Sequence, residues 1–329
     1  MNKSSKRLPM FVRWLAILAV TLILLSVVKD LLIKATIEIT APQIIGAKVD
    51  MGSFSLGLLT HKIHITNFRL YNPPGFPNQV FLVMPEMTLQ VDIGELMRGE
   101  MHFPLVVLNM EKMVVFKNEE GKLNVDSLKI IEEQIKASKG KPMKLPVFKI
   151  DVLKLNLGKV IFEDGSHAPV PFVQAYDVAI KDKTIKNING LPKLITIMIV
   201  EALKPTAIRS AGLFAATSLM GVAFLPALAV GVVVANDESK AQLNHSSQRV
   251  YQESLKLIKE LNGNIKKTEE KQGKIFAKVY GCDISIEIQD KGWGKSAILI
   301  KARKYLLAKP EIAAGLLYQL TQRLNKNIL

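Results

Sequence analysis

The sequence predicts a membrane-anchored α+β protein with two β-containing domains. Three observations predict this class. An uncharged run lies near the N-terminus, and alternating apolar and polar positions recur through residues 36–180. Near the C-terminus, helical periodicity flanks a second group of alternating segments. A chain of 329 residues is long enough for two domains with separate hydrophobic cores.

Residues 1–34 predict a cytoplasmic N-terminus and a transmembrane anchor. Trp14–Val28 is uncharged, and Arg13 and Lys29, which flank it, can extend their charged ends toward the lipid headgroups. Phe11–Ile33 is therefore expected to form one membrane-spanning helix. No small-residue cleavage site follows this run, so we expect an uncleaved inner-membrane anchor with the following domain in the periplasm.

Residues 35–186 predict a β-rich domain. In "MTLQVDI", the apolar residues occupy every second position, which is typical of a strand with one buried face. In "KIHITNFRL", the apolar phase slips after Ile65, and a bulge near Thr66–Asn67 explains the slip. The turn signals "NPPGFPN", "NEEGK" and "EDGS" separate the strands.

Two turns in this region carry a family resemblance. The first is Asn-Pro-x-Gly-Phe, formed by Asn72, Pro73, Gly75 and Phe76; the second contains Asn118, Gly121, Asn124 and Leu128. With the anchor and the spacing between the turns, residues 8–165 resemble the start of an AsmA-like protein.

The resemblance implies a bacterial inner-membrane protein with an antiparallel periplasmic β-groove lined by apolar side chains. Larger members of this family are implicated in moving phospholipid across the envelope. On this basis the candidate lipid-facing residues are Ile63, Ile65, Met87, Leu89, Val91 and Ile93.

Two apolar segments follow. Residues 187–206 predict an apolar helix over Leu191–Leu203, which could close the mouth of the groove. Residues 207–235 predict a second membrane segment, because Ala211–Asn236 carries no charge. A full crossing would place residues 236–329 in the cytoplasm, whereas a re-entrant path broken at Pro226 would leave them in the periplasm.

Residues 236–329 predict a domain of αββββα order. Its first helix is capped by Ser246 or Ser247, and Pro310 opens its last helix. With the small-residue run before it, the segment Val250–Gly281 resembles a family of small bacterial exported lipoproteins of unknown function. That family offers no activity, and this chain lacks the lipoprotein cysteine near the apolar run.

The composition and motifs predict no catalytic residues, no cofactor and no metal site, so we expect a protein that is not an enzyme. The net charge is +15, but the basic residues are scattered and aromatic residues make up 6%, which disfavours a nucleic-acid partner. His61 and His64 would point to opposite faces of a strand. The acidic residues Glu86, Asp92 and Glu95 are interpreted as solvated groups.

Two functions remain open. One is a groove that binds or helps to move membrane phospholipid. The other is a structural scaffold or adapter in an envelope complex, with other envelope proteins or a second copy of the chain as partners. In the second case the apolar strand faces are simply core. The discriminating feature is whether the apolar face is open or covered by the helix at Leu191–Leu203.

Overall fold

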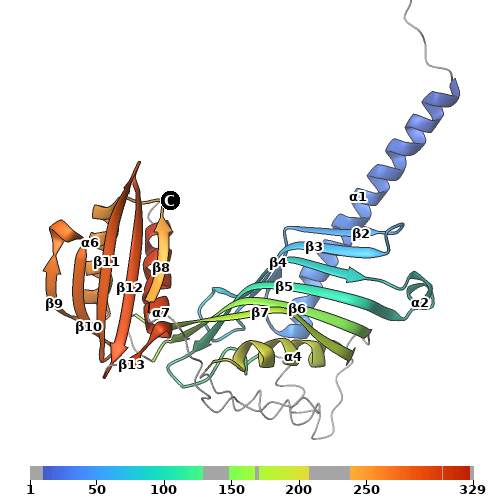
Figure 1. Cartoon of the computed structure of the whole chain (residues 1–329). Helices are drawn as coiled ribbons and strands as arrows, with labels where there is room; N and C mark the ends of the chain where they lie inside the picture. Colours follow the sequence, from blue (N-terminus) through green and yellow to red (C-terminus); the bar gives the residue numbers. More distant parts are fainter. Residues whose placement is uncertain (1–9, 129–147, 167–169, 207–237, 306, 327–329) are drawn as a thin grey trace, which may run out of the picture.

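The computed structural model describes residues 10–128, 148–166, 170–206, 238–305 and 307–326. Its strands form two sheets, which belong to two domains that meet at helix α7 (Figure 1). We call the seven-stranded sheet, formed by residues 49–189, sheet A. The six-stranded sheet, formed by residues 238–308, is sheet B.

Sheet A has the order β1-β3-β4-β5-β6-β7, and β2 also pairs with β3. Its strands are β1 (Val49–Asp50), β2 (Ser53–Gly57), β3 (Lys62–Tyr71), β4 (Val80–Gln90), β5 (Met101–Lys117), β6 (Phe148–Asp164) and β7 (Phe172–Asn189). All neighbours are antiparallel except β5 and β6, which are parallel. The bulge expected near Thr66–Asn67 does not appear in the register with β4, which shifts only between Leu70 and Tyr71. Asn67 instead has a left-handed backbone, with φ of 51°.

Helix α1 (Met10–Ile45) continues well beyond the predicted anchor. Its charged residues bind the backbone of the first strands. The Asp30 carboxylate accepts a hydrogen bond from Leu56 N at 3.0 Å, and the Glu38 carboxylate accepts one from Met51 N at 2.9 Å. These contacts satisfy backbone groups near the edge of sheet A that would otherwise be open to another strand. Asp30 and Glu38 therefore attach the C-terminal half of α1 to the first strands of sheet A.

The predicted membrane anchor is corrected by this structure. Among the described residues, no helix is both long enough and apolar enough to cross a membrane. The membrane-anchored fold class and the inner-membrane localisation based on Phe11–Ile33 are therefore wrong, and the described chain is a mixed α/β protein with two sheets. The second predicted membrane segment, residues 207–235, lies outside the described residues.

Helix α4 (Leu191–Leu203) packs on β6 and β7, and every residue of its second half, from Thr196 to Leu203, is buried. Its buried residues belong to the same hydrophobic cluster as Leu153 and Leu155 of β6. Glu201 is only 7% exposed, and its carboxylate pairs with Lys183 of β7 at 2.7 Å and with Lys204. Although burial works to raise the pKa of Glu201, the two lysines hold that pKa below its usual value.

The second domain contains helix, four strands and helix in succession, with two additional short strands. Its elements are β8 (Glu238–Leu243), α6 (Ser247–Glu260), β9 (Asn264–Glu269), the 3₁₀ turn η1 (Glu270–Gln272), β10 (Lys274–Val279), β11 (Cys282–Gly292), β12 (Lys295–Lys304), β13 (Leu307–Ala308) and α7 (Pro310–Lys326). As the alternation predicts, Ile275, Ala277 and Val279 are buried together. Ser246 caps α6 by accepting a hydrogen bond from Arg249 N.

Helix α7 serves both domains. Ile312, Leu316 and Leu320 are buried in the core of the second domain. Ala314 and Tyr318 pack instead on a small apolar cluster of sheet A that includes Val173. Between these two groups, Gly315 lies so close to β7 that a Cβ atom would be 2.0 Å from the Val173 carbonyl oxygen. The absent side chain therefore allows α7 to approach sheet A (Figure 1).

We predict that Gly315→Ala destabilises the protein. In a solvated helix this change would stabilise by up to about 1 kcal/mol, because alanine has the higher helix propensity. Here the added methyl group must push α7 away from β7, at a cost of about 1–3 kcal/mol. Chemical denaturation would measure the difference. Gln322→Ala, on the exposed side of α7, is the matched control. A more stable Gly315→Ala variant would contradict the close approach.

We also predict an acid-dependent loss of stability that depends on Glu201. Its folded-state pKa is lowered, so its contribution is fully present above the ordinary carboxylate pKa and is lost as the pH falls through the folded value. Glu201→Gln should cost about 1–2 kcal/mol at neutral pH, less than for a fully buried pair because both lysines are partly solvated.

Denaturation curves at several pH values between about pH 5 and pH 3 would measure this dependence. Glu201→Gln should flatten the loss of stability in that range. Glu120→Gln removes the exposed pair with Lys122 and should leave the pH dependence unchanged. Parallel curves for wild type and Glu201→Gln would contradict the assignment.

Candidate functional site

The first candidate site is the apolar face of sheet A, which holds most of the predicted groove residues. Two rows of side chains run across the strands. One joins Ile63, Leu89, Val106 and Leu153, and the other joins Ile65, Met87, Leu108 and Leu155. All eight side chains belong to, or pack against, one hydrophobic cluster that also contains the buried face of α4. The structure therefore brings Ile63, Ile65, Met87 and Leu89 together.

Burial along these rows deepens toward β6. Leu153 and Leu155 are fully buried beneath α4, whereas Met87 and Leu89 in β4 are partly buried. At the other edge, Ile37, Ala41 and Ile44 of α1 pack against the same cluster. Helices thus pack on the apolar face from both edges of the sheet, as its hydrophobic core requires.

Val91 and Ile93 do not continue this face. Strand β4 ends at Gln90, and Ile93 is the first residue of the short helix α2 (Ile93–Met97). Asp92 caps that helix, since its side chain accepts a hydrogen bond from Glu95 N at 3.0 Å. The sequence carries this signal, because Asp followed three residues later by Glu is typical of a capped helix start.

The two turns that carry the family resemblance contact each other. Asn124 is fully buried, and its side-chain amide donates to Asn72 Oδ1 at 2.7 Å and to the Val114 carbonyl at 2.9 Å. Its side-chain oxygen accepts from Phe116 N at 3.0 Å. These bonds tie the loop after β5 to the loop after β3. Within the described residues the motif therefore has a clear structural role: it holds two loops at one end of sheet A.

The second candidate site was not identified from the sequence. His102, near the start of β5, lies among three carboxylates. Its Nδ1 atom is 2.9 Å from Glu95 Oε2 and 4.0 Å from Asp92 Oδ2, and its Nε2 atom is 2.7 Å from Asp151 Oδ2. Asp92, Glu95 and His102 are the one group of three such ligands that the described residues bring within reach of a single metal ion. We call these three residues and Asp151 the His102 cluster.

The electrostatics of the His102 cluster favour ionised carboxylates. Asp151 pairs with Lys149 through its other carboxylate oxygen, Oδ1, at 3.0 Å. The hydrogen bond from Lys149, and then that from His102, hold the pKa of Asp151 below its usual value. The sequence missed the cluster for two reasons. Asp92 and Glu95 were interpreted as solvated groups, and Asp151 lies on a strand 49 residues beyond His102.

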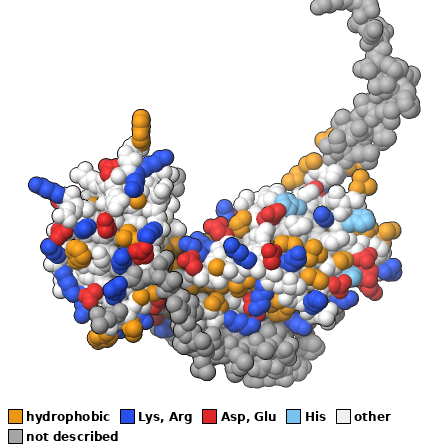
Figure 2. Space-filling view, in the orientation of Figure 1, with side chains coloured by type: hydrophobic (Ala, Val, Ile, Leu, Met, Phe, Trp, Pro, Cys, Tyr) orange, Lys and Arg blue, Asp and Glu red, His pale blue; other side chains and the backbone are white. Residues whose placement is uncertain are grey.

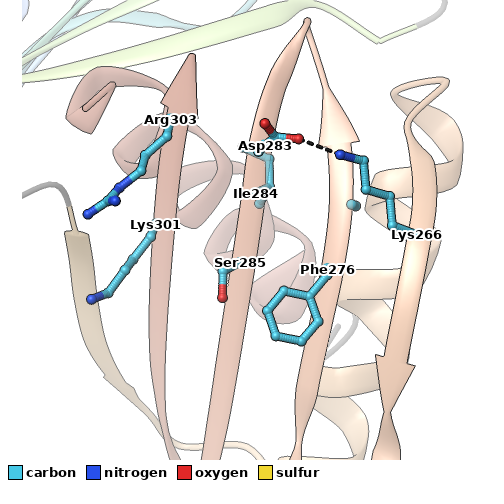
Figure 3. A pocket seen from close by; sticks show the side chains of 8 residues that line it. Lys266, Phe276, Asp283, Ile284, Ser285, Lys301 and Arg303 are labelled. Carbon is cyan, nitrogen blue, oxygen red and sulfur yellow. Dashed lines mark hydrogen bonds and ion pairs between the residues drawn. The ribbon is translucent and has the colours of Figure 1, made fainter. Parts of the chain in front are cut away.

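The other polar features have ordinary explanations. His61 lies in the turn before β3, and His64 forms an exposed contact with Glu86 at 3.8 Å. On the outer face of sheet B, a shallow hollow is lined by polar and charged side chains around Phe276 (Figure 3). Its Lys266 pairs with Asp283 at 2.6 Å, and its Lys301 pairs with Glu238 at 3.1 Å. On the face shown in Figure 2, basic side chains are scattered among acidic ones.

Comparisons with protein-family models, curated proteins and solved structures give no match to this chain. The resemblances to AsmA-like proteins and to exported lipoproteins therefore rest on the sequence motifs alone. Nothing in the described residues or in the comparisons supports phospholipid transport, and with the membrane anchor corrected that expectation is not retained. The candidate sites must be interpreted from their own chemistry.

Proposed function

We propose that this chain is a scaffold or adapter that presents two rigidly joined sheet domains to protein partners. The observation that carries the proposal is the packing of the apolar face of sheet A. Its central rows join the core of the first domain, which contains the buried face of α4. When the apolar face of the sheet forms the hydrophobic core, it stabilises the domain and is not available to bind a ligand.

The contact between the domains supports the same proposal. The Phe172 ring of β7 meets the Tyr280 ring of the second domain edge-on, with centroids 4.3 Å apart. Gln319 of α7 donates a hydrogen bond to the Pro171 carbonyl at 3.1 Å. Apolar packing, a ring contact and a hydrogen bond together resist rotation of one domain against the other. A rigid adapter would use this property to keep its two domains at a fixed separation.

The chemistry of the described residues also favours a binding role over catalysis. Tyr176, Tyr280 and Tyr318 have pKa values raised by burial, which disfavours the phenolate form. The Cys282 thiol is buried, and burial raises its pKa as well. These groups pack in or beside the contact between the domains or in the core, where they contribute apolar area.

We predict that truncation of the apolar rows reduces stability in proportion to burial. Leu153→Ala removes a fully buried side chain and should cost about 2–5 kcal/mol. Leu89→Ala lies in the same row but is only partly buried, and it should cost about 1–2 kcal/mol. Chemical denaturation of both variants would measure these costs.

A photo-crosslinking residue at position 89 provides the direct test against a lipid groove. In the scaffold proposal it captures the chain's own core residues, even when phospholipid vesicles are present. Capture of phospholipid at position 89, with unchanged stability of Leu89→Ala and Leu153→Ala, would contradict the proposal. The exposed residue Leu59 is a matched control site for nonspecific capture, since its side chain is 98% exposed.

A further inference from the structure

We propose that Asp92, Glu95 and His102 bind a divalent transition-metal ion, with Asp151 as the residue that orients His102. The proposal is independent of the scaffold function, because the His102 cluster lies near α2, at the end of sheet A far from the second domain (Figure 1). It rests on the hydrogen-bonding state of one histidine, on the distances between four side chains and on the types of ligand atom present.

The two nitrogen atoms of His102 face different carboxylates. At 2.7 Å, the Nε2–H group donates a hydrogen bond to Asp151 Oδ2. A carboxylate in this position fixes the tautomer and leaves the lone pair on Nδ1. Metal-binding histidines almost always have such a carboxylate, carbonyl or water partner on the nitrogen that does not bind the metal. Asp151 is thus a positioning residue, and Nδ1 is the expected ligand atom.

Nδ1 of His102 lies beside the carboxylate of Glu95. Nδ1 is buried and makes no hydrogen bond, although Glu95 Oε2 lies only 2.9 Å away. The two atoms are close but are not aligned as donor and acceptor. A lone pair beside a carboxylate oxygen is repulsive unless a proton or a metal ion lies between the two atoms. The missing alignment for a hydrogen bond disfavours the proton. The same arrangement is favourable when both atoms bind one metal ion.

The distances between the ligand atoms fit those around a single metal ion. A zinc-type ion lies about 2.0–2.2 Å from nitrogen and oxygen ligands, so two atoms on one ion are at most about 4.4 Å apart. The distances from Nδ1 to Glu95 Oε2 and to Asp92 Oδ2, 2.9 Å and 4.0 Å, both meet this limit. The three ligand atoms all lie within 4.8 Å of one another, so the side chains need to move only slightly to share an ion.

The types of ligand atom indicate the class of ion. One imidazole nitrogen and two carboxylate oxygens suit Zn²⁺ or Mn²⁺ better than a soft copper(I) ion, which prefers sulfur, or Mg²⁺, which prefers oxygen alone. Asp92 and Glu95 have side chains that are 41% and 31% exposed, whereas that of His102 is 13% exposed. An ion held here would therefore face solvent on one side, and water or a partner's carboxylate could complete its coordination.

The experiment is a calorimetric titration of the full chain, first treated with a chelator, with Zn²⁺, Mn²⁺ and Mg²⁺ in turn. We expect saturation by Zn²⁺ at one equivalent and binding of Mg²⁺ that is at least tenfold weaker. His102→Ala and Glu95→Gln should each weaken Zn²⁺ binding at least tenfold. Asp151→Asn should weaken it about 10–100-fold, as is typical when such a partner is lost.

His64→Ala is the matched control, because His64 also lies beside a carboxylate, Glu86, but has no second acidic partner in the described structure. It should leave Zn²⁺ affinity unchanged. If His102→Ala does not fold, Glu95→Gln decides, since Asp92 caps α2 through the backbone of residue 95 and that bond survives.

Three results would overturn the proposal. One is the absence of saturable Zn²⁺ binding by the wild type, which would leave the cluster as an ion-pair network around a protonated histidine. The second is an equal loss of affinity in His64→Ala and His102→Ala. The third is unchanged affinity in a folded Glu95→Gln variant.

Discussion

The close approach of α7 to β7 is the contact on which the arrangement of the two domains depends. Gly315 allows this approach because any side chain would collide with the Val173 carbonyl. The residues beside it divide the helix between two hydrophobic clusters, since Leu316 packs in the second domain and Tyr318 packs on sheet A. A helix that contributes to two cores cannot leave one domain without exposing apolar area from both. The relative orientation of the domains is therefore part of the fold.

Within the first domain, a helix packs at each of the two edges of sheet A. On the side of β1 and β2, the charged residues of α1 hydrogen-bond to strand backbone, including Leu56 N and Met51 N. On the side of β7, α4 is held by the pair between Glu201 and Lys183. Both contacts use charged groups in otherwise apolar helices. In this fold, apolar helices that resemble membrane segments in sequence pack against the edges of a sheet. The apolar face between them becomes the core that the scaffold function requires.

The strands could be predicted from the sequence, but the role of the N-terminal helix could not. Alternation located the strand containing Met87 and Leu89 and the one containing Ile284 and Ile286, because burial on one face imposes a period of two. Uncharged length alone could not reveal that Asp30 and Glu38 have partners in sheet A. The parallel pairing of β5 and β6 was also missed, since it depends on contacts between distant segments. The His102 cluster was missed for the same reason: Asp151 reaches His102 only through that parallel pairing.

Helix α7 holds the two domains in one orientation. The most direct test is a distance measurement by pulsed electron resonance between spin labels on Lys62→Cys in β3 and Gln289→Cys in β11, both at exposed positions. The single native cysteine, Cys282, is buried and would remain unlabelled. We expect one narrow distance distribution in the full chain. A broad distribution, or several separate distances, would show that the domains move independently and would contradict this expectation.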